Sequence, residues 1–125
     1  MRDAGLPSAD VDEQLLLDLT SFQRDLLFVV AGRGAASGQE LKAELEEATG
    51  ETVLPGQLYP NLDELQRNGL VRKEVRDGRT NDYSATERGR GVLSALVRWQ
   101  CERVDPALAE ADWPASDGPT SDRPN

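Results

Sequence analysis

Apolar residues recur at every third or fourth position through most of the chain, which is the spacing of amphipathic helices. The pattern predicts a short helix over residues 9–19, a second helix over residues 20–34 and a third over residues 37–50. Ser37 and Glu40 have the spacing of a capping box, so they mark the start of the third helix.

The next amphipathic segment, from about Pro55 to Asn68, contains an internal proline. Leucines at helical spacing form its expected buried stripe: Leu54, Leu58, Leu62 and Leu65. A proline within a helix removes one hydrogen bond and clashes with the carbonyl four residues earlier. For Pro60 that residue is Gly56, which can shift aside, and the helix is only just past its free first turn. We therefore expect the helix to continue through Pro60 with a smooth outward face.

The period changes to two after this helix, where apolar and charged residues alternate, and an Asp-Gly pair signals a turn. This segment is predicted to be a β-hairpin. Facing residues of a hairpin share one side of the sheet. If Val71 and Val75 lie on the same face as Tyr83 and Ala85, the loop holds an odd number of residues, and we expect a three-residue loop, residues 77–79.

Thr86 is the expected cap of a long final helix, whose apolar residues cover more than half of its circumference. The Asp105-Pro106 step should break or kink this helix, because proline disfavours the helical conformation of the residue before it. Three helices, a two-stranded hairpin and a further helix are the element order of a winged helix-turn-helix. We therefore predict a mainly α fold with a small β-hairpin, a winged helix-turn-helix flanked by N-terminal and long C-terminal helices for dimerisation.

The same order divides the chain into four predicted parts. Residues 1–19 are an N-terminal arm and short helix, and residues 20–86 are the winged helix-turn-helix domain. Residues 87–112 are a C-terminal dimerisation helix, and residues 113–125, which are polar and rich in Pro, Ser and Asp, are a disordered tail.

Composition narrows the class of protein. With 125 residues, 38% of them hydrophobic, the chain can form one compact domain with a core. No apolar run approaches the roughly 18 residues of a membrane span, and the N-terminus lacks the apolar core of a signal peptide, so we expect a cytoplasmic protein. The chain has no histidine and one cysteine, which excludes an intrachain disulfide and a Cys/His zinc site. Without a Gly-rich phosphate loop or a metal-ligand cluster, we expect no enzymatic activity and no metal.

The net charge is −9, which by itself argues against binding to nucleic acid. The charges are unevenly distributed, however. Residues 1–66 hold four basic and thirteen acidic residues, residues 67–90 hold seven and four, and residues 91–125 hold three and six. A cationic segment within an acidic chain is compatible with a DNA-binding surface. It is equally compatible with arginines that only balance local acids on a solvated surface.

An ordered set of short motifs resembles the PadR-like winged-helix transcriptional regulators over roughly residues 20 to 95. They are Gly-x-Leu-Tyr-Pro-x-Leu at 56–62, Asn-Gly-Leu at 68–70, Asp-Gly-Arg at 77–79, Tyr83, and Thr-Glu-x-Gly at 86–89. The resemblance implies a homodimeric, DNA-binding transcription regulator, usually a repressor, with its C-terminal helix in the dimer interface.

The acidity of the chain resembles that of proteins from extreme halophiles. Haloarchaea carry short PadR-like regulators of this kind, including one that responds to oxidative stress. Ordinary DNA binding weakens steeply as salt rises, because it releases counterions. A protein working in molar salt could instead take up cations such as K⁺ between its carboxylates and the phosphates. Apart from such ions we expect no cofactor.

In this fold the helix at 55–68 enters the major groove, the third helix approaches phosphate with its N-terminus, and the hairpin reaches a neighbouring groove. The candidate DNA-binding residues are Ser37, Gln39, Lys42, Gln57, Tyr59, Pro60, Asn61, Arg67, Lys73, Arg76 and Arg79. The Gln57 amide can pair with adenine, and Arg76 and Arg79 bracket the hairpin tip. For each polar residue the alternative is an ordinary surface or capping role.

Apolar residues of the terminal helices are the candidates for the dimer interface: Leu15, Leu16, Leu19, Leu93, Leu96, Trp99 and Val104. Cys101 lies among them, and we interpret it as a small buried hydrophobe; a redox sensor would need an exposed thiolate of low pKa. Winged helices also serve as docking modules for proteins, and fold alone does not choose between these roles. The acidic surface favours a protein-interaction module, whereas the arginines at the hairpin tip favour DNA.

Overall fold

A computed structural model of the protein describes residues 18–109, which fall into two compact units. The first unit ends at Leu93 and the second begins at Ser94. The helix predicted over residues 9–19 lies almost wholly outside the described residues, as do the dimer candidates Leu15 and Leu16 and the predicted tail.

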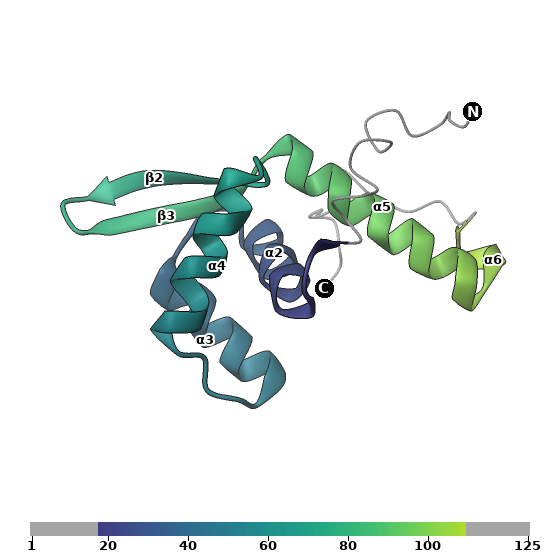
Figure 1. Ribbon diagram of the computed structural model, residues 1–125, viewed down its shortest axis with the longest axis horizontal. Coiled ribbons are helices and arrows are strands. Elements are labelled where there is room, and N and C mark those ends of the chain that lie inside the picture. Colours follow the sequence, from purple (N-terminus) through teal and green to yellow (C-terminus); the bar gives the residue numbers. More distant parts are fainter. Residues whose placement is uncertain (1–17, 110–125) are drawn as a thin grey trace, which may run out of the picture. The chain divides into compact units, whose positions relative to one another are not determined.

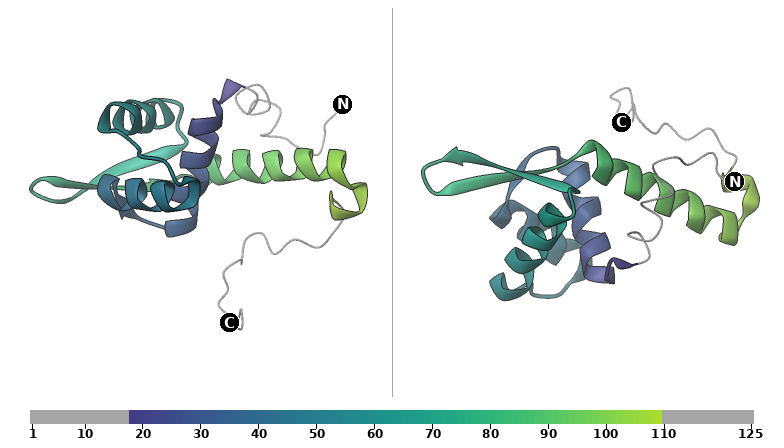
Figure 2. Two further views of the ribbon diagram at one scale, coloured as in Figure 1. Left: turned by 90° about the horizontal axis from the view of Figure 1, so that it is seen from below. Right: turned by 45° about the horizontal axis from the view of Figure 1, so that its top comes forward.

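The helices and strands of the first unit are joined by short connections. In chain order they are α2 (Ser21–Arg33), β1 (Ala36–Ser37), α3 (Gly38–Thr49), α4 (Pro55–Arg67), β2 (Val71–Asp77) and β3 (Thr80–Ala85). Helix α5 (Glu87–Val104) starts in this unit and continues into the second, where α6 (Pro106–Ala109) follows. Figures 1 and 2 show the hairpin of β2 and β3 extending beyond the helices α3 and α4.

Side-chain caps determine where α2 and α3 begin. The Thr20 hydroxyl accepts a hydrogen bond from Gln23 N at 3.1 Å, and the Ser37 hydroxyl accepts one from Glu40 N at 3.2 Å. In both boxes the third helical residue bonds back to the backbone N–H of the cap. Helix α3 ends at Gly50, whose φ of 76° is in the left-handed region that favours glycine. The predicted bounds of both helices are confirmed.

The core of the first unit is built around α2, which packs against α3, α4 and β3. Leucines dominate it, and the side chains that are at most 2% exposed include Leu26, Leu27, Val30, Leu41, Leu45, Leu58, Leu62, Leu65 and Leu70. Burying each such side chain contributes about 1.5–3 kcal/mol. The predicted leucine stripe of α4 is therefore confirmed, with one exception.

Leu54 is the exception, because 61% of its surface is exposed. It is the N-cap of α4, with an extended conformation (φ −88°, ψ 149°), so its side chain leaves the helix before the first turn. Its carbonyl accepts hydrogen bonds from Gln57 N and Leu58 N, both at 2.9 Å. Pro60 lies inside the helix as expected, and α4 continues through it to Arg67.

The sheet has three antiparallel strands in the order β1-β3-β2, whereas the sequence predicted only the hairpin. The missing strand, Ala36–Ser37, is too short to show any periodicity. It pairs with β3 at Tyr83 and Asp82 and so joins the start of α3 to the hairpin. This pairing fixes the hairpin relative to α3.

The predicted register of the hairpin is correct, but the predicted loop is wrong. Val71 pairs with Ala85 and Val75 with Asn81, so the expected residues share one face. A register shift between Val75 and Asp77 then pairs Asp77 with Thr80, which leaves a two-residue turn, residues 78–79. The bulge inserts one extra residue, Arg76, into β2. Because of this extra residue, the predicted face of the strands is kept although the turn holds two residues and not three.

The junction between α4, β2 and α5 is held by backbone contacts. Thr86 N donates to Leu70 O at 3.0 Å, the Thr86 hydroxyl donates to Gly69 O at 2.6 Å, and Gly89 N donates to the Thr86 hydroxyl at 3.0 Å. Thr86 therefore caps α5 as predicted. In the second unit α5 ends at Val104, and the Asp105 carboxylate accepts a hydrogen bond from Ala107 N at 3.1 Å, so the predicted break before Pro106 is confirmed.

Candidate nucleic-acid interface

A hollow of about 500 Å³, which we call the notch, lies where the start of α3, the first turns of α4 and the end of the hairpin meet. Its lining residues are Ser37, Gly38, Gln39, Tyr59, Arg76, Arg79, Thr80, Asn81 and Tyr83. Five of the eleven candidate DNA-binding residues are among them: Ser37, Gln39, Tyr59, Arg76 and Arg79. Three elements that are distant in the sequence thus contribute to one surface.

The Tyr59 ring lies directly over Gly38, at the N-terminus of α3. A Cβ atom added at Gly38 would come within 2.8 Å of the Tyr59 Cζ, so no larger residue fits beneath this ring without moving it. Ser37 is 92% buried and its hydroxyl is used as the cap of α3. Gln39, the next residue of this turn, is exposed.

A second tyrosine forms the floor of the notch. Tyr83 is 4% exposed, and this burial, more than the neighbouring Tyr59 and Asp63, raises the pKa of its phenol; a hydrogen bond with Asn81 acts in the opposite direction. The phenol therefore stays protonated and neutral at any physiological pH. The notch thus offers hydroxyl and amide groups with cations at its edge, a composition that suits an anionic oxygen.

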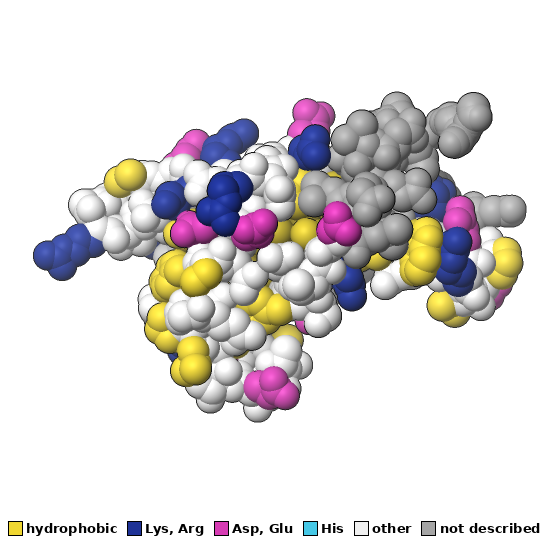
Figure 3. All heavy atoms as spheres, in the orientation of Figure 1, with side chains coloured by type: hydrophobic (Ala, Val, Ile, Leu, Met, Phe, Trp, Pro, Cys, Tyr) yellow, Lys and Arg dark blue, Asp and Glu magenta, His cyan; other side chains and the backbone are white. Residues whose placement is uncertain are grey.

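The outward face of α4 carries little charge near its start. Three residues of this face are exposed: Gly56, Gln57 and Pro60. Figure 3 shows the surface over the start of α4 as mostly hydrophobic and uncharged, with charged side chains gathered near its end. Gln57 is therefore the exposed amide near the start of this helix, outside the notch but on the same side of α4 as Pro60.

Two other candidates on α4 are occupied by protein partners. The Asn61 amide accepts a hydrogen bond from Gln23 Nε2 at 2.9 Å and donates one to Gln57 O at 2.7 Å, so it links α4 to α2. Arg67 is exposed, and its guanidinium lies 2.5 Å from the Glu64 carboxylate. Asn61 has a structural role here, and the charge of Arg67 is offset.

The hairpin differs from the helices in how its cations are paired. Among the described residues, the side chains of Arg72, Lys73 and Arg79 make no ion pair or hydrogen bond, and all three are exposed. Figure 3 shows a basic side chain at the free end of the hairpin, where the turn contains Arg79. Lys73 lies on β2 opposite Tyr83, outside the notch.

Arg76 is the exception on the hairpin. Its Nη2 lies 2.6 Å from Asp82 Oδ1 and 3.2 Å from Glu40 Oε1. These carboxylates, Asp82 first, raise the pKa of Arg76. The Glu40 carboxylate also accepts a hydrogen bond from Ser37 N at 2.9 Å, and this bond, followed by Arg76, lowers the pKa of Glu40. Arg76 was predicted as a site residue, but neither acid was predicted as its partner. The contact with Glu40 spans 36 positions and leaves no local signal, and the contact with Asp82 depends on the bulge that redirects Arg76.

Lys42 does not line the notch. Its ammonium lies 3.1 Å from Glu46 on the same helix. The Glu46 carboxylate accepts a hydrogen bond from Val53 N at 2.8 Å, and this bond, more than Lys42, lowers the pKa of Glu46. Lys42 therefore supports the connection between α3 and α4.

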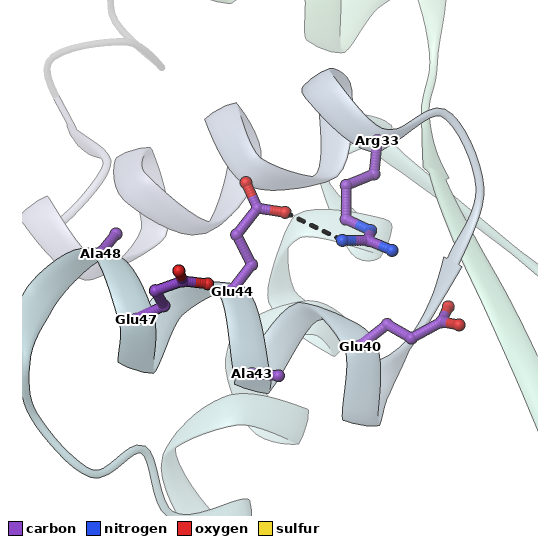
Figure 4. Close-up of a pocket in the computed structure, with 6 residues that line it drawn as sticks. All are labelled: Arg33, Glu40, Ala43, Glu44, Glu47 and Ala48. Carbon is purple, nitrogen blue, oxygen red and sulfur yellow. Dashed lines mark hydrogen bonds and ion pairs between the residues drawn. The ribbon is translucent and has the colours of Figure 1, made fainter.

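An acidic groove lies on the outer side of α3, lined by Arg33, Glu40, Ala43, Glu44, Glu47 and Ala48 (Figure 4). Glu44 and Arg33 point toward each other across it and form an ion pair of 3.2 Å. The Glu40 carboxylate points away from that pair. Glu40 lines this groove and not the notch, although it contacts Arg76, which lines the notch.

The candidates for a dimer interface differ in exposure. Leu19 and Leu93 are buried in the first unit, and Leu96, in the second, is 6% exposed. Trp99 is 36% and Val104 77% exposed, and the Arg103 guanidinium lies over the Trp99 ring, 4.1 Å from its centroid. Cys101, on the same helix, is a free thiol and half-buried. The second unit thus presents apolar surface to solvent.

Residues 18–109 carry neither a metal-ligand cluster nor a membrane-spanning helix. No cluster of three or more His, Cys, Asp or Glu residues there is arranged to hold a metal ion. None of the helices in that part of the chain is long and apolar enough to cross a membrane.

The three helices α2, α3 and α4, followed by the strands β2 and β3, define a winged-helix protein, with β2 and β3 as the wing. The chain belongs to the PadR-like family of transcriptional regulators, whose family model matches residues 26–95. The fold, the family and the class of transcription regulator expected from the sequence are thereby confirmed.

The solved structures that resemble the chain include a haloarchaeal protein of this family. A structure of H. salinarum RosR has 41% sequence identity, covers 74% of this chain and 93% of its own, and gives a TM-score of 0.64. A complex of the same protein has 40% identity, covers 76% and 93%, and gives a TM-score of 0.66. A PadR-like transcription factor from Bacteroides fragilis, at 21% identity, covers 82% and 99% with a TM-score of 0.62 and shows the shared fold. No curated protein sequence gives a significant match.

Proposed function

We propose that the protein is a homodimeric, sequence-specific DNA-binding regulator that represses transcription at a pseudo-palindromic site. Helix α4 enters a major groove with Gln57 toward the bases, a backbone phosphate occupies the notch, and the wing reaches a neighbouring groove. The observation that carries the proposal is the notch, in which the start of α3, Tyr59 of α4 and the tip of the wing converge. Repression is the usual action of the family that the sequence resembles.

The charges of the wing support this assignment. Phosphate contacts need cations that are not already neutralised, since binding strength comes largely from the release of counterions. On α3 and α4 the described cations, Lys42 and Arg67, have acidic partners, whereas Arg72, Lys73 and Arg79 of the wing have none among the described residues. The wing therefore supplies most of the attraction for DNA.

Dimerisation in the proposal uses α5. Trp99 and Val104 expose apolar surface on a helix of the second unit, and such surface is stabilised when it is covered by a partner. Val104→Asp should shift the protein from dimer to monomer in sedimentation velocity. Val75→Asp is the matched control, because Val75 is similarly exposed (73%) but lies on the wing. Equal sedimentation of both variants and the wild type as dimers would contradict a role for Val104 in the interface.

Salt adaptation is part of the proposal. The acidic residues Glu40, Glu44 and Glu47 line the groove on the outer side of α3, and among them Glu40 contacts Arg76 of the notch. Their negative charge, that of Glu40 above all, would oppose a phosphate at low salt. In molar KCl, K⁺ ions taken up between these carboxylates and the phosphates offset that repulsion. This uptake of K⁺ is tested by measuring DNA affinity by fluorescence anisotropy between about 0.1 and about 3 M KCl. A steep loss of affinity over this range, as for ordinary DNA-binding proteins, would contradict the uptake.

The central experiment is DNA binding by the wild type and two variants. A duplex is first selected from random sequence by the full-length protein. The double variant Arg72→Ala/Arg79→Ala should then bind it at least about tenfold more weakly, since each substitution removes one phosphate contact. Arg90→Ala is the control, because Arg90 is an exposed arginine on α5 without an acidic partner among the described residues. An equal loss in both proteins would show that general charge, not the wing, is responsible.

The acidic groove supports one rival function, that of a winged-helix module that binds protein instead of DNA. A basic segment of a partner would suit the three glutamates of α3 better than DNA does. If random-sequence selection yields no bound duplex at any KCl concentration, this second function takes precedence. The protein is a regulator in either case, and we propose no enzymatic activity for it.

A further inference from the structure

The contact between Arg76 and Glu40 joins the wing to α3 at the edge of the notch. Arg76 is the residue inserted by the bulge of β2, and the bulge directs it toward two carboxylates on two different elements. The nearest oxygen of Asp82, Oδ1, is shielded from solvent and makes no well-aligned hydrogen bond within the described residues. Its attraction to Arg76 Nη2 at 2.6 Å is therefore mainly electrostatic.

Glu40 occupies the place where an anion would bind. The N-terminus of a helix attracts anions through its free N–H groups and its dipole. The Glu40 carboxylate, through its bond to Ser37 N at 2.9 Å, already lies at the N-terminus of α3. It therefore competes with any phosphate in the notch both for this helix end and for Arg76.

The charges of the three residues decide the sign of the effect. One guanidinium and two carboxylates leave a net charge of −1 beside the notch. While both contacts hold, Arg76 offers no unbalanced positive charge to DNA. A phosphate must replace the Glu40 carboxylate on Arg76, or it must bind against its repulsion.

We propose that Glu40 acts as an intramolecular competitor for the DNA phosphate at Arg76, and that this contact weakens DNA binding at low salt. The proposal rests on the proposed function, since it concerns the same notch. The effect diminishes in molar KCl, because the screening length there is only about 3 Å. Glu40 thus shifts the working range of the protein toward high salt.

The test compares Glu40→Gln with Glu44→Gln. Glutamine at position 40 can still complete the capping box, so α3 keeps its start. Each variant removes one negative charge from α3, but Glu44 pairs with Arg33, which does not line the notch. Affinity for the duplex selected by the wild type is measured at about 0.1 M and about 2 M KCl, and thermal unfolding confirms that each variant is folded.

We expect Glu40→Gln to bind about three- to tenfold more tightly than wild type at the lower salt, the effect of one charge near a protein surface, and the gain to shrink at the higher salt. Glu44→Gln should stay within about twofold. In an Arg76→Ala background the gain from Glu40→Gln should fall below about twofold, because the competition acts through Arg76. Equal gains from both glutamates, or a full gain without Arg76, would overturn the proposal.

The outcomes also separate this inference from the proposed function. Binding by the wild type with no gain from Glu40→Gln would reject the competitor and leave DNA binding intact. If the selection with wild type yields no duplex, it is repeated with Glu40→Gln. Binding by the variant alone would support the competitor in its strongest form, and binding by neither would reject both.

Discussion

Gly89, near the start of α5, lies directly against the backbone of Leu70. The cost of substituting this glycine can therefore be predicted. A Cβ atom added there would fall inside the van der Waals distance of the Leu70 carbonyl oxygen and 3.1 Å from the carbonyl carbon. These are backbone atoms, so they cannot rotate away. The same oxygen accepts the hydrogen bond from Thr86 N at 3.0 Å, and moving it would break that bond.

Three effects set the magnitude of a Gly89→Ala substitution. Alanine favours a helix over glycine by about 1 kcal/mol. Crowding in a packed site costs about 1–3 kcal/mol, and losing the bond from Thr86 N costs about 1 kcal/mol more. We therefore expect the free energy of unfolding to fall by about 1–3 kcal/mol, which lowers the Tm of a domain of this size by about 4–8 °C per kcal/mol.

Gly91→Ala is the matched control, because it lies two residues further along α5, is exposed, and has nothing within 4 Å of an added Cβ atom. Without the clash, only the helix preference acts, and we expect a gain of about 0.5–1 kcal/mol. Thermal and urea unfolding followed by circular dichroism measure both variants. If Gly89→Ala is as stable as wild type, or shifts in the same direction as Gly91→Ala, the assigned contact with Leu70 is wrong.

Three further predictions concern the notch and its supports. Pro60→Ala should raise the free energy of unfolding by about 1–3 kcal/mol, since it restores a helical hydrogen bond in α4, and an unchanged Tm would contradict this. Asn61→Ala should lower the free energy of unfolding by about 1 kcal/mol by leaving Gln23 without its partner, and the loss should become smaller when Gln23→Ala is already present, because only the bond to Gln57 O is then lost. The pKa of Glu40 is lowered by folding, so its stabilising effect is complete above its unfolded pKa of about 4.5 and is lost as pH falls through the lower folded value. Urea unfolding against pH should therefore show a smaller acid loss for Glu40→Gln than for wild type.

Most of the fold follows from local patterns that the sequence displays openly. The capping boxes, the leucine stripe of α4 and the alternation of the hairpin each act within a few residues, and each predicted its element correctly. The predictions were wrong or incomplete where a contact with a distant part of the chain determines the local structure. The turn at 78–79 depends on the bulge at Arg76, and the strand Ala36–Ser37 exists only because β3 lies beside it.

The candidate site was predicted less completely, for a physical reason. Helical position indicates which side chains face outward, but it does not indicate which of them already have a partner. Asn61 was a candidate for DNA contact on the sequence, but its side chain already bonds to Gln23, which is 38 positions away. Arg76 and Arg79 looked alike on the sequence, yet only Arg76 is held by two carboxylates.

The electrostatic potential at the notch is therefore better judged from which charges are paired than from the net charge of the chain or of a segment. The net charge of −9 suggests repulsion of DNA, and the excess of three cations in residues 67–90 suggests attraction. Within that segment Arg67 and Arg76 are offset by acidic partners, so the segment sum overstates the attraction. What remains is a wing whose other cations, Arg72, Lys73 and Arg79, are exposed and have no acidic partner in the described part of the chain, next to an α3 that carries four glutamates. Screening by salt weakens the attraction of the wing and the repulsion of α3 together. The balance between them, rather than either one, sets the salt concentration at which the protein would bind DNA best.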